Sequence, residues 1–352
     1  MKPHDFVLSA TLLLGSVDYS QAADNTLPAN ASASDLALEN ARGLAGNDRY
    51  LKITEALQCH EIGPDGKPVD AGSEVVNVAV PPTQVFDNLY YIGGTRTGSW
   101  LLTTPEGYIM IDSMYGNSPE TVTIPGMKAL GLDPAKIKYI MITHAGPDHV
   151  GGAKYFQEKY GTRILMSQPD WDAILSPQVA SWMLDTRPKS ERPLQERDWA
   201  GSPVIDMVGK EGDTITLGGT TVRIFFTPRR ADGGGLSYIA PVFDQGKPHV
   251  WATYGNTGVP TSVADRTIHR ASIQRFQHEM KLAKVDAITS SHPFVDGSNL
   301  RISVLQKREP GMANPFLIGR DTAQNYLGIL DECTAVVMGR NAAGLDDNGA
   351  PR

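Results

Sequence analysis

Three side chains that often bind metals or transfer protons lie close together in the segment ITHAGPDHVGGAKYF. They are His144, Asp148 and His149, and a fourth candidate, His292, lies in the later segment AITSSHPF. Two imidazoles and a carboxylate suit zinc or iron, and a catalytic zinc usually has three protein ligands and an open position. A histidine beside a carboxylate also serves as a general base near neutral pH without a metal. The residues alone therefore leave a one-metal site and a metal-free acid–base site open.

Two adjacent arginines could bind or stabilise a negative charge. Arg229 and Arg230 lie in FTPRRADGGG, where either guanidinium could bind a substrate carboxylate or stabilise an oxyanion or enolate. Solvation of Arg229 is an equally good interpretation. Tyr254 and Asn256, in WATYGNTG, could add hydrogen bonds to a substrate. We therefore take Arg229, Tyr254 and Asn256 as candidate substrate-binding residues and Arg230 as a candidate catalytic residue.

The segments around these residues predict how they are positioned. KIKYIMITHA is typical of a buried strand that ends at the chemistry, and GGAKYFQEKYG predicts the helix after it. DTITLGGTTVRIFFTP predicts a hairpin, and ASIQRFQHEMKLAKVD an amphipathic helix. This order of elements predicts an α/β fold, an αββα sandwich of two mixed β-sheets flanked by helices. The candidate residues follow strand C-termini, where α/β folds place their sites.

The N-terminus has the layout of a secretory signal peptide. Lys2 precedes an apolar run, 6–14, and small residues allow cleavage near Ala22. The run is too short to span a membrane, and a disordered arm is the alternative. We expect a secreted or periplasmic protein. Composition divides the chain into a signal peptide (1–22), an N-terminal arm with a short helix (23–77), a main domain (78–300) with a lid-like insertion (170–204), a C-terminal helical extension (301–340) and a disordered tail (341–352).

Composition narrows the partners. The 352 residues are 41% hydrophobic and 20% charged, with a net charge of −7, which fits a globular protein. No basic run interleaved with aromatic residues is present, so we expect no nucleic acid partner. A small-molecule substrate, including one that carries a carboxylate, is the expected partner. The two cysteines, Cys59 and Cys333, are read equally well as a disulfide or as two buried thiols.

Five segments, in order, resemble the motifs of one family. They are YIMIDSM, THAGPDHVGG, FTPRRADGGGLSY, WATYGNTG and SSHPF. Together they resemble the metallo-β-lactamase superfamily over roughly residues 78 to 300, and the branch that includes the B3 lactamases most of all. The second segment is similar to the family motif T-H-x-H-x-D-H-x-G-G, and the third to a strand that normally ends T-P-G-H.

The resemblance implies that the first of the family's two metal sites is degenerate. Of its three histidines only His144 is kept, because Gly146 and Arg230 stand at the other two positions. One histidine cannot hold a metal, and a guanidinium is always charged, so we expect this site to hold none. Asp112, at the end of the first motif, would hydrogen-bond His144.

The same resemblance implies that the second metal site is intact. Its ligands would be Asp148, His149 and His292, while Asn256 stands where the family has a bridging aspartate. The expected cofactor is one zinc or iron ion, or none.

Three functions follow from this site. The first is a hydrolase of an ester, lactone, thioester or amide that uses one metal or none. The second is a metal-independent lyase or isomerase with a His/Asp base and an arginine that binds the anion. The third is a ligand-binding pseudoenzyme. We favour an enzyme, and among enzymes the hydrolase.

Overall fold

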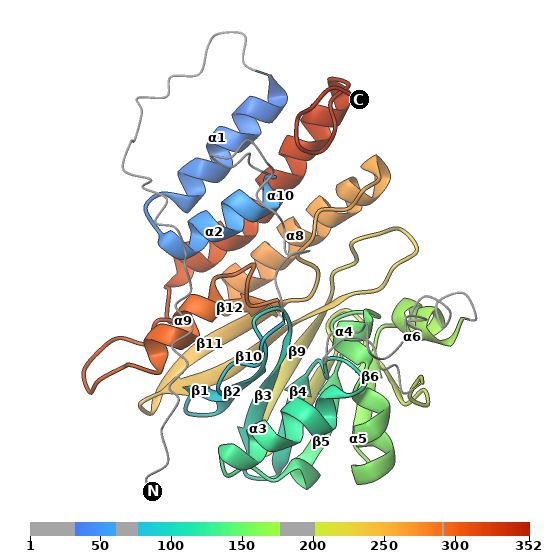
Figure 1. Ribbon diagram of the computed structural model, residues 1–352, viewed down its shortest axis with the longest axis vertical. Coiled ribbons are helices and arrows are strands. Elements are labelled where there is room, and N and C mark those ends of the chain that lie inside the picture. Colours follow the sequence, from blue (N-terminus) through green and yellow to red (C-terminus); the bar gives the residue numbers. More distant parts are fainter. Residues whose placement is uncertain (1–31, 61–76, 177–200, 291) are drawn as a thin grey trace, which may run out of the picture. The chain divides into compact units, whose positions relative to one another are not determined.

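The protein was analysed as a computed structural model that describes residues 32–60, 77–176, 201–290 and 292–352. Two mixed β-sheets pack face to face, and helices cover both outer faces (Figure 1). This arrangement confirms the expected αββα sandwich. The expected signal peptide, 1–22, lies outside the described residues. Within the described residues, no helix has both the length and the apolar character needed to cross a membrane.

The first sheet has seven strands in sequence order, antiparallel from β1 to β4 and parallel from β4 to β7. All five residues of β4 are buried, as expected for a strand covered on both faces. The strands are β1 (Thr83–Phe86), β2 (Leu89–Gly93), β3 (Gly98–Thr104), β4 (Gly107–Ile111), β5 (Ile137–Met141), β6 (Arg163–Met166) and β7 (Met207–Val208). Its outer face carries a π-helical turn (Pro119–Thr123), α3 (Ile124–Ala129) and α5 (Ala153–Tyr160).

The second sheet has five strands in the order β12-β11-β10-β9-β8, of which only β11 and β12 are paired parallel. Its strands are β8 (Thr214–Leu217), β9 (Thr220–Phe226), β10 (Leu236–Asp244), β11 (Lys247–Tyr254) and β12 (Ala287–Ser290). The predicted β8–β9 hairpin is confirmed. It turns at Gly218 and Gly219, whose φ angles of 52° and 80° suit glycine.

Aromatic side chains join the two sheets. Trp100 of β3 packs 6.0 Å, centroid to centroid, from both Trp251 of β11 and Phe316. The Trp100 indole N–H also donates a hydrogen bond to the carbonyl of Ser290, 2.8 Å away, at the end of β12. This bond crosses the core and fixes the strand end from which His292 follows.

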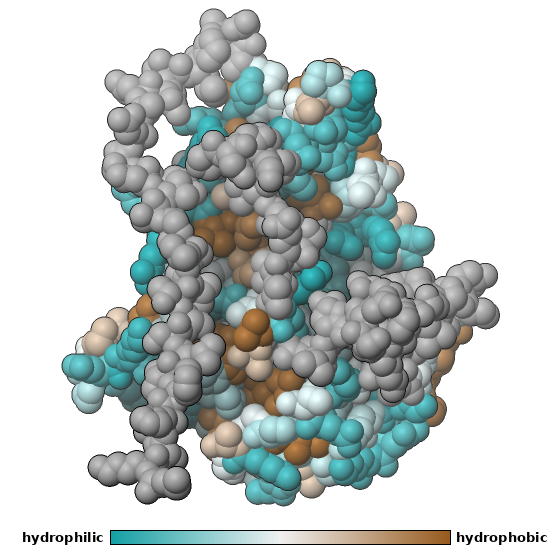
Figure 2. Space-filling model, in the orientation of Figure 1, coloured by the Kyte–Doolittle hydropathy of each residue, from teal (hydrophilic) through white to brown (hydrophobic). Residues whose placement is uncertain are grey.

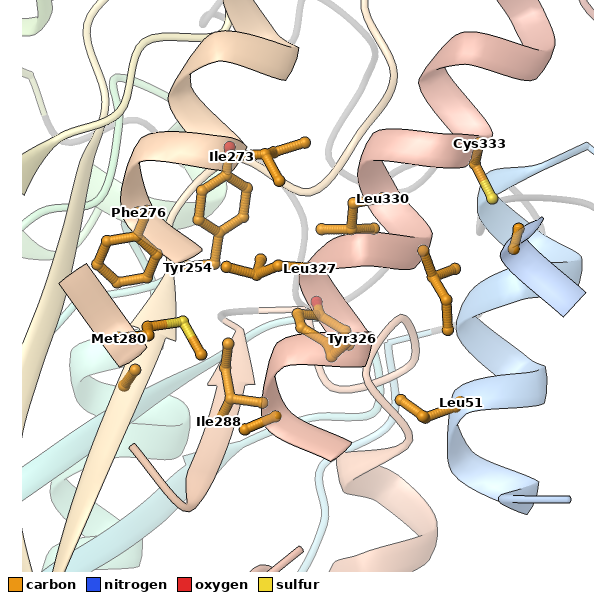
Figure 3. Packing of buried hydrophobic residues seen from close by; sticks show 14 of the residues in the cluster. Leu51, Tyr254, Ile273, Phe276, Met280, Ile288, Tyr326, Leu327, Leu330 and Cys333 are labelled. Carbon is orange, nitrogen blue, oxygen red and sulfur yellow. The ribbon is translucent and has the colours of Figure 1, made fainter. Parts of the chain in front are cut away.

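A layer of helices covers the second sheet (Figure 1). It consists of α1 (Ala33–Ala45), α2 (Arg49–Gln58), α8 (Val263–Ala283) and α10 (Arg320–Ala342), with α9 (Ser298–Leu305) at its edge. Figure 3 shows the packing between α8, α10 and the sheet, made by Tyr254, Ile273, Phe276, Met280, Ile288, Tyr326, Leu327 and Leu330. Hydrophilic residues cover much of the outer surface of this layer, and hydrophobic residues gather near the middle of the same view (Figure 2).

The helix α1 differs from the expectation of an N-terminal arm with one short helix, because the described part of 23–77 forms two helices, α1 and α2. Ser32 and Asp35 form a reciprocal capping box, which satisfies backbone N–H groups at the start of α1. Ala37, Ala41 and Ala45 recur every fourth residue and are buried against α10 and its neighbours. Alanine gives a weak hydrophobic signal, so this stripe resembles linker composition in the sequence.

The end of α2 is linked covalently to α10. Cys59 and Cys333 form a disulfide between residues separated by 274 positions, which decides between the two interpretations left open by the sequence. The carbonyl of Cys59 also accepts a hydrogen bond from Arg340, 2.9 Å away. The N-terminal helices are therefore part of the main body.

The C-terminal residues, 341–352, differ from the disordered tail that we expected. They turn back on themselves through a bridge between Leu345 and Pro351. Asp347 forms an ion pair, 3.2 Å long, with Arg266, whose side chain is fully buried. A buried guanidinium needs an anion and hydrogen-bond acceptors, and this requirement holds the tail in place.

The expected lid-like insertion, 170–204, is described only at its two ends. It begins within α6 (Gln168–Leu175), where Trp171 is buried and donates a hydrogen bond to the carbonyl of Met207. Residues 177–200 lie outside the described part of the chain.

Candidate functional site

All the candidate residues except Tyr254 come together at the carboxyl ends of strands from both sheets. His144 follows β5, and Asp148 and His149 lie in the next short helix, α4 (Pro147–Val150). Four more follow strands of the second sheet: Arg229 and Arg230 after β9, Asn256 after β11 and His292 after β12.

Asp148, His149 and His292 form a compact set of potential metal ligands. Their ligand atoms all lie within 4.8 Å of one another. The two imidazole Nε2 atoms are 3.2 Å apart, and Asp148 Oδ2 is 3.5 Å from the first and 3.9 Å from the second. Tetrahedral zinc, with bonds of about 2.0–2.1 Å, separates its ligand atoms by about 3.3 Å. The donor types and their spacing therefore fit one zinc-sized ion.

Each of the two histidines is oriented through its other ring nitrogen. His149 Nδ1 lies 2.8 Å from the Asp112 carboxylate, and His292 Nδ1 lies 3.0 Å from the carbonyl of Arg96. Both acceptors require an N–H on Nδ1, which leaves each Nε2 directed at the common point. This is the usual arrangement around metal-binding histidines, whose second nitrogen donates to a carboxylate or carbonyl.

Asp112 contacts a different histidine from the expected one. We predicted a hydrogen bond to His144, but the carboxylate lies against His149. The backbone at Asp112 has a φ of 59°, and the Thr143 N–H and hydroxyl both donate to its carboxylate, at 2.7 and 2.8 Å. These bonds hold the carboxylate within reach of the His149 ring.

His144, Asp148, His149 and His292 differ in charge. Burial lowers the pKa of His149, but the Asp148 and Asp112 carboxylates outweigh it and raise that pKa to about 9. Burial raises the pKa of Asp148, and His149 and His292 more than reverse this. Burial, and then the charge of His149, lower the pKa values of His144 and His292. At neutral pH without a metal, His149 is protonated, Asp148 is ionised, and the other two imidazoles are neutral.

A side chain at Gly146, where the family motif has a histidine, would force the neighbouring site side chains to shift. A Cβ atom there would lie 2.8 Å from His149 Cδ2, 2.9 Å from Asp148 Oδ1 and 3.1 Å from His144 Nε2. The rings of His144 and His149 pack 4.0 Å apart, centroid to centroid. Across the described residues, no second group of three metal-binding side chains converges.

Arg229, rather than Arg230, lies next to the histidines. Its Nη1 donates a 3.3 Å hydrogen bond to the carbonyl of Gly258, and its charge lowers the pKa values of His144 and His149. Burial, and then the charge of Arg230, lower the pKa of Arg229 itself. Arg230 lines the same cleft, but its side chain is exposed.

The cleft has two lobes that share His144, Asp148, Arg229 and Asn256. Lobe 1, about 540 Å³, is also lined by Ala145, Gly146, Pro147, Pro169, Asp170, Ala173, Arg230, Asp232, Gly233 and Gly234. Lobe 2, about 290 Å³, is also lined by Gln58, His60, Arg96, Thr257, Gly258, Val259, His292, Phe294 and Val295. The shared residues separate the lobes, so a bound molecule could extend into both.

Asn256 and Tyr254 have different places. Asn256 lines both lobes and donates a hydrogen bond, 2.8 Å long, to the carbonyl of Thr227. Tyr254 is buried in the core between Phe276 and His269, and it lines neither lobe. Its hydroxyl has no hydrogen-bond partner within the described residues. The structure therefore places Tyr254 outside the site, because its side chain points from β11 towards α8 (Figure 3).

Asp170 is a site residue that sequence reasoning missed. Its carboxyl group is buried in lobe 1, where it accepts hydrogen bonds from the Ser167 hydroxyl at 2.6 Å and from the Ala145 N–H at 2.9 Å. Burial raises the pKa of Asp170 to about 6. The spacing Ser167-x-x-Asp170 is a helix-capping signal, which was present in the sequence at the edge of the irregular insertion.

Comparisons with known proteins agree with this architecture. A family model described as the metallo-beta-lactamase superfamily matches residues 92–232. A mutant of the metallo-β-lactamase FEZ-1 from Legionella gormanii superposes with a TM-score of 0.63 and 23% identity, over 77% of this chain and 100% of that one. BJP-1, a subclass B3 metallo-β-lactamase of Bradyrhizobium japonicum, gives a TM-score of 0.60 and 23% identity, over 77% and 99%.

One curated relative is a hydrolase of another type. A hydroxyacylglutathione hydrolase from Rhodopseudomonas palustris (strain BisB18) is 25% identical over 146 residues, 40% of this chain. The match spans 44% of that protein, less than half of its length.

Proposed function

We propose that this chain, whose fold is that of the metallo-β-lactamase superfamily, is a small-molecule hydrolase. Its substrate would be an ester, lactone, thioester or amide. It would act with the second metal site alone, or with no metal, after loss of the first site. The name of a curated relative, a hydroxyacylglutathione hydrolase, supports the reaction class.

The convergence of Asp148, His149 and His292 carries this proposal. These three side chains would hold one zinc or iron ion, since two imidazoles and one carboxylate suit either metal. When bound, such an ion supplies Lewis acidity and lowers the pKa of a water to about 7. The hydrogen bonds from Asp112 and the Arg96 carbonyl keep the ligand rings in place.

The other shared residues of the cleft have roles that do not need a metal. Arg229 places a fixed positive charge beside the histidines, where it would stabilise the oxyanion of an attacked carbonyl. His144 is neutral at pH 7 because burial lowers its pKa, so it can accept a proton from water. Asn256 lines both lobes and would bind the substrate through its amide.

The pairing of neutral His144 with Arg229 also supports a second candidate. A neutral base beside a guanidinium is suited to removing a proton next to a carbonyl and stabilising the enolate. In that case the protein is a metal-independent lyase or isomerase. The two candidates differ in their products, because hydrolysis of an acyl bond places solvent oxygen in the carboxylic acid that is released.

Metal content and isotope transfer test these proposals. Purified protein would be dialysed, its metal measured, and a panel of esters, lactones, thioesters and amides assayed in ¹⁸O water with and without a strong chelator. We expect ¹⁸O in the acid product, and loss of activity in His292→Ala but not in His278→Ala, an exposed histidine of α8. Activity that survives the chelator eliminates the metal version. Turnover without ¹⁸O incorporation favours the lyase or isomerase.

We also propose that the protein is exported. The Cys59–Cys333 disulfide supports this, since disulfides persist mainly in oxidising compartments. Fractionation of cells that produce the full chain, with N-terminal sequencing, should find a mature form that begins near residue 23. An uncleaved chain with free thiols in the cytosol would contradict the proposal.

A further inference from the structure

One wall of lobe 2 comes from the helices at the two ends of the chain rather than from the sheets. Gln58 and His60 reach this lobe from the end of α2, and neither has a role in the hydrolysis proposed above. Both lie outside residues 92–232, the part that the family model matches. This wall is therefore an addition to the matched part of the fold, and its residues are candidates for determining which substrates bind.

The backbone at His60 is held from three sides. Its φ of 51° lies in the left-handed region, which histidine adopts more readily than most residues, so the helical path ends before it. The preceding residue, Cys59, is joined to α10 by the disulfide with Cys333. Arg340 of α10 donates to the carbonyl of Cys59 at 2.9 Å and to that of His60 at 3.4 Å. These constraints keep His60 at the wall of lobe 2.

The C-terminal tail orients the His60 ring. A hydrogen bond with the Asn348 side chain favours the protonated form of the imidazole, so a ring N–H donates to the amide oxygen. The tail is itself fixed, because the Asn348 N–H donates to the Asp346 carboxylate at 2.9 Å. Arg340 donates to the carbonyl of Asp347 at 2.8 Å. The same arginine therefore holds the backbone of His60 and the tail that orients its ring.

The imidazole of His60 is neutral at pH 7. Burial lowers the pKa of His60 below its usual value, although the Asp347 carboxylate and the Asn348 hydrogen bond raise it. A neutral imidazole has one N–H and one nitrogen with a lone pair. Because the N–H is directed at Asn348, the lone pair is the group that this ring can offer to lobe 2. Such an acceptor selects a ligand that carries a hydrogen-bond donor.

We propose that His60 is a specificity-determining residue that accepts a hydrogen bond from a hydroxyl group of the substrate in lobe 2, and that Asn348 positions its ring. A hydroxyl fits because it also accepts, and the Gln58 amide in the same wall has N–H groups to donate. The volume of about 290 Å³ and the apolar side chains of Val259 and Phe294 suit a short hydroxyalkyl chain. This assignment of substrate class rests on the proposed hydrolase activity for its kinetic test, but not for its binding test.

The kinetic test compares two esters that differ in one group. They are the p-nitrophenyl esters of ε-hydroxycaproic acid and of heptanoic acid, in which a methyl group replaces the hydroxyl. His60→Phe keeps a ring and removes both nitrogens. We expect the ratio of kcat/KM, hydroxy ester over alkyl ester, to be about tenfold higher in wild type than in this variant, since the variant loses one hydrogen bond to the hydroxyl. A purely structural residue would change both esters equally, and an unchanged ratio overturns the proposal.

Two further variants separate positioning from general effects. Asn348→Ala keeps the imidazole but removes the group that orients it, so it should lower the same ratio by a smaller factor than His60→Phe does. His278→Phe, at an exposed histidine of α8, is the matched control and should keep the wild-type ratio. A wild-type ratio in Asn348→Ala contradicts the positioning role of Asn348.

The binding test uses the wild-type protein and does not depend on turnover or on the folding of His60→Phe. The methyl ketones of the same two chains, which cannot be hydrolysed, would be titrated into protein labelled with ¹⁵N-histidine. The hydroxy ketone should shift the signal of the unprotonated His60 nitrogen, which is identified by its displacement in Asn348→Ala, and the alkyl ketone should not. No shift, or equal shifts with both ketones, overturns the proposal. If the shift is selective but no ester, lactone, thioester or amide is hydrolysed, the subsite stands and the hydrolase proposal fails.

Discussion

Asp170 offers a direct test of the electrostatics of lobe 1. Its carboxyl group is 3% exposed and receives hydrogen bonds from the Ser167 hydroxyl and the Ala145 N–H. Burial raises its pKa from the usual 3.8 to about 6, because the ionised form loses its hydration. Asp170→Asn keeps the size of the side chain and an acceptor for Ala145, but it removes the titration.

The direction of the effect follows from proton linkage. Between about pH 4 and pH 6 the native state binds more protons at Asp170 than the unfolded state does. Stability must therefore fall as the pH rises through this window. Each pKa unit corresponds to about 1.4 kcal/mol, so a shift from 3.8 to about 6 amounts to about 3 kcal/mol. The stability of wild type relative to Asp170→Asn should decrease by most of this amount, about 2.5 kcal/mol, between pH 4 and pH 7.

Urea unfolding at pH 4, 5, 6 and 7 measures this difference. Asp35→Asn is the matched control, because Asp35 also caps a helix beside a serine but is exposed. The Ser32 hydroxyl lowers the pKa of Asp35, so the control should show a pH dependence of opposite sign. A difference between wild type and Asp170→Asn that stays constant, or grows with pH, would refute the reasoning.

Three further substitutions test other parts of the structure. Gly146→His should not raise the bound zinc to two ions per chain, because a Cβ atom there would lie 2.8–3.1 Å from three site residues; metal analysis showing two ions would contradict this. The double variant Cys59→Ser, Cys333→Ser should have a free energy of unfolding about 5 kcal/mol lower, because the disulfide closes a loop of 274 positions. Urea unfolding measures this loss, and a loss below about 1 kcal/mol would count against the prediction. Tyr254→Phe should keep turnover and leave stability equal or about 1 kcal/mol higher, because the hydroxyl is buried without a partner; a large loss of kcat would return Tyr254 to the site.

The fold could be predicted because its motifs are local. Asp112, the HAGPDH segment and His292 each follow an apolar strand, and the order of strands and helices defines the sandwich. The position of Cys59 beside Cys333 could not be predicted, because a disulfide over 274 positions depends on the packing of α2 against α10. The helix α1 was missed because alanines bury little apolar surface and give little periodicity.

The finer details of the site depend on geometry that residue types do not encode. Arg229 and Arg230 are adjacent, and only the path of the chain after β9 decides which one lies beside His144. Asp112 could have turned to either of two neighbouring rings, and its left-handed backbone and the bonds from Thr143 select His149.

The pairing of the first and last helices has a consequence for biosynthesis. α1 and α2 are made early, but their packing surface, α10, begins only at Arg320. The ribosome therefore completes every strand of both sheets before it adds Cys333. Until then Cys59 has no disulfide partner. An exposed thiol at Cys59 is therefore a chemical mark of an unfinished chain, and its disappearance reports that the last helix has docked.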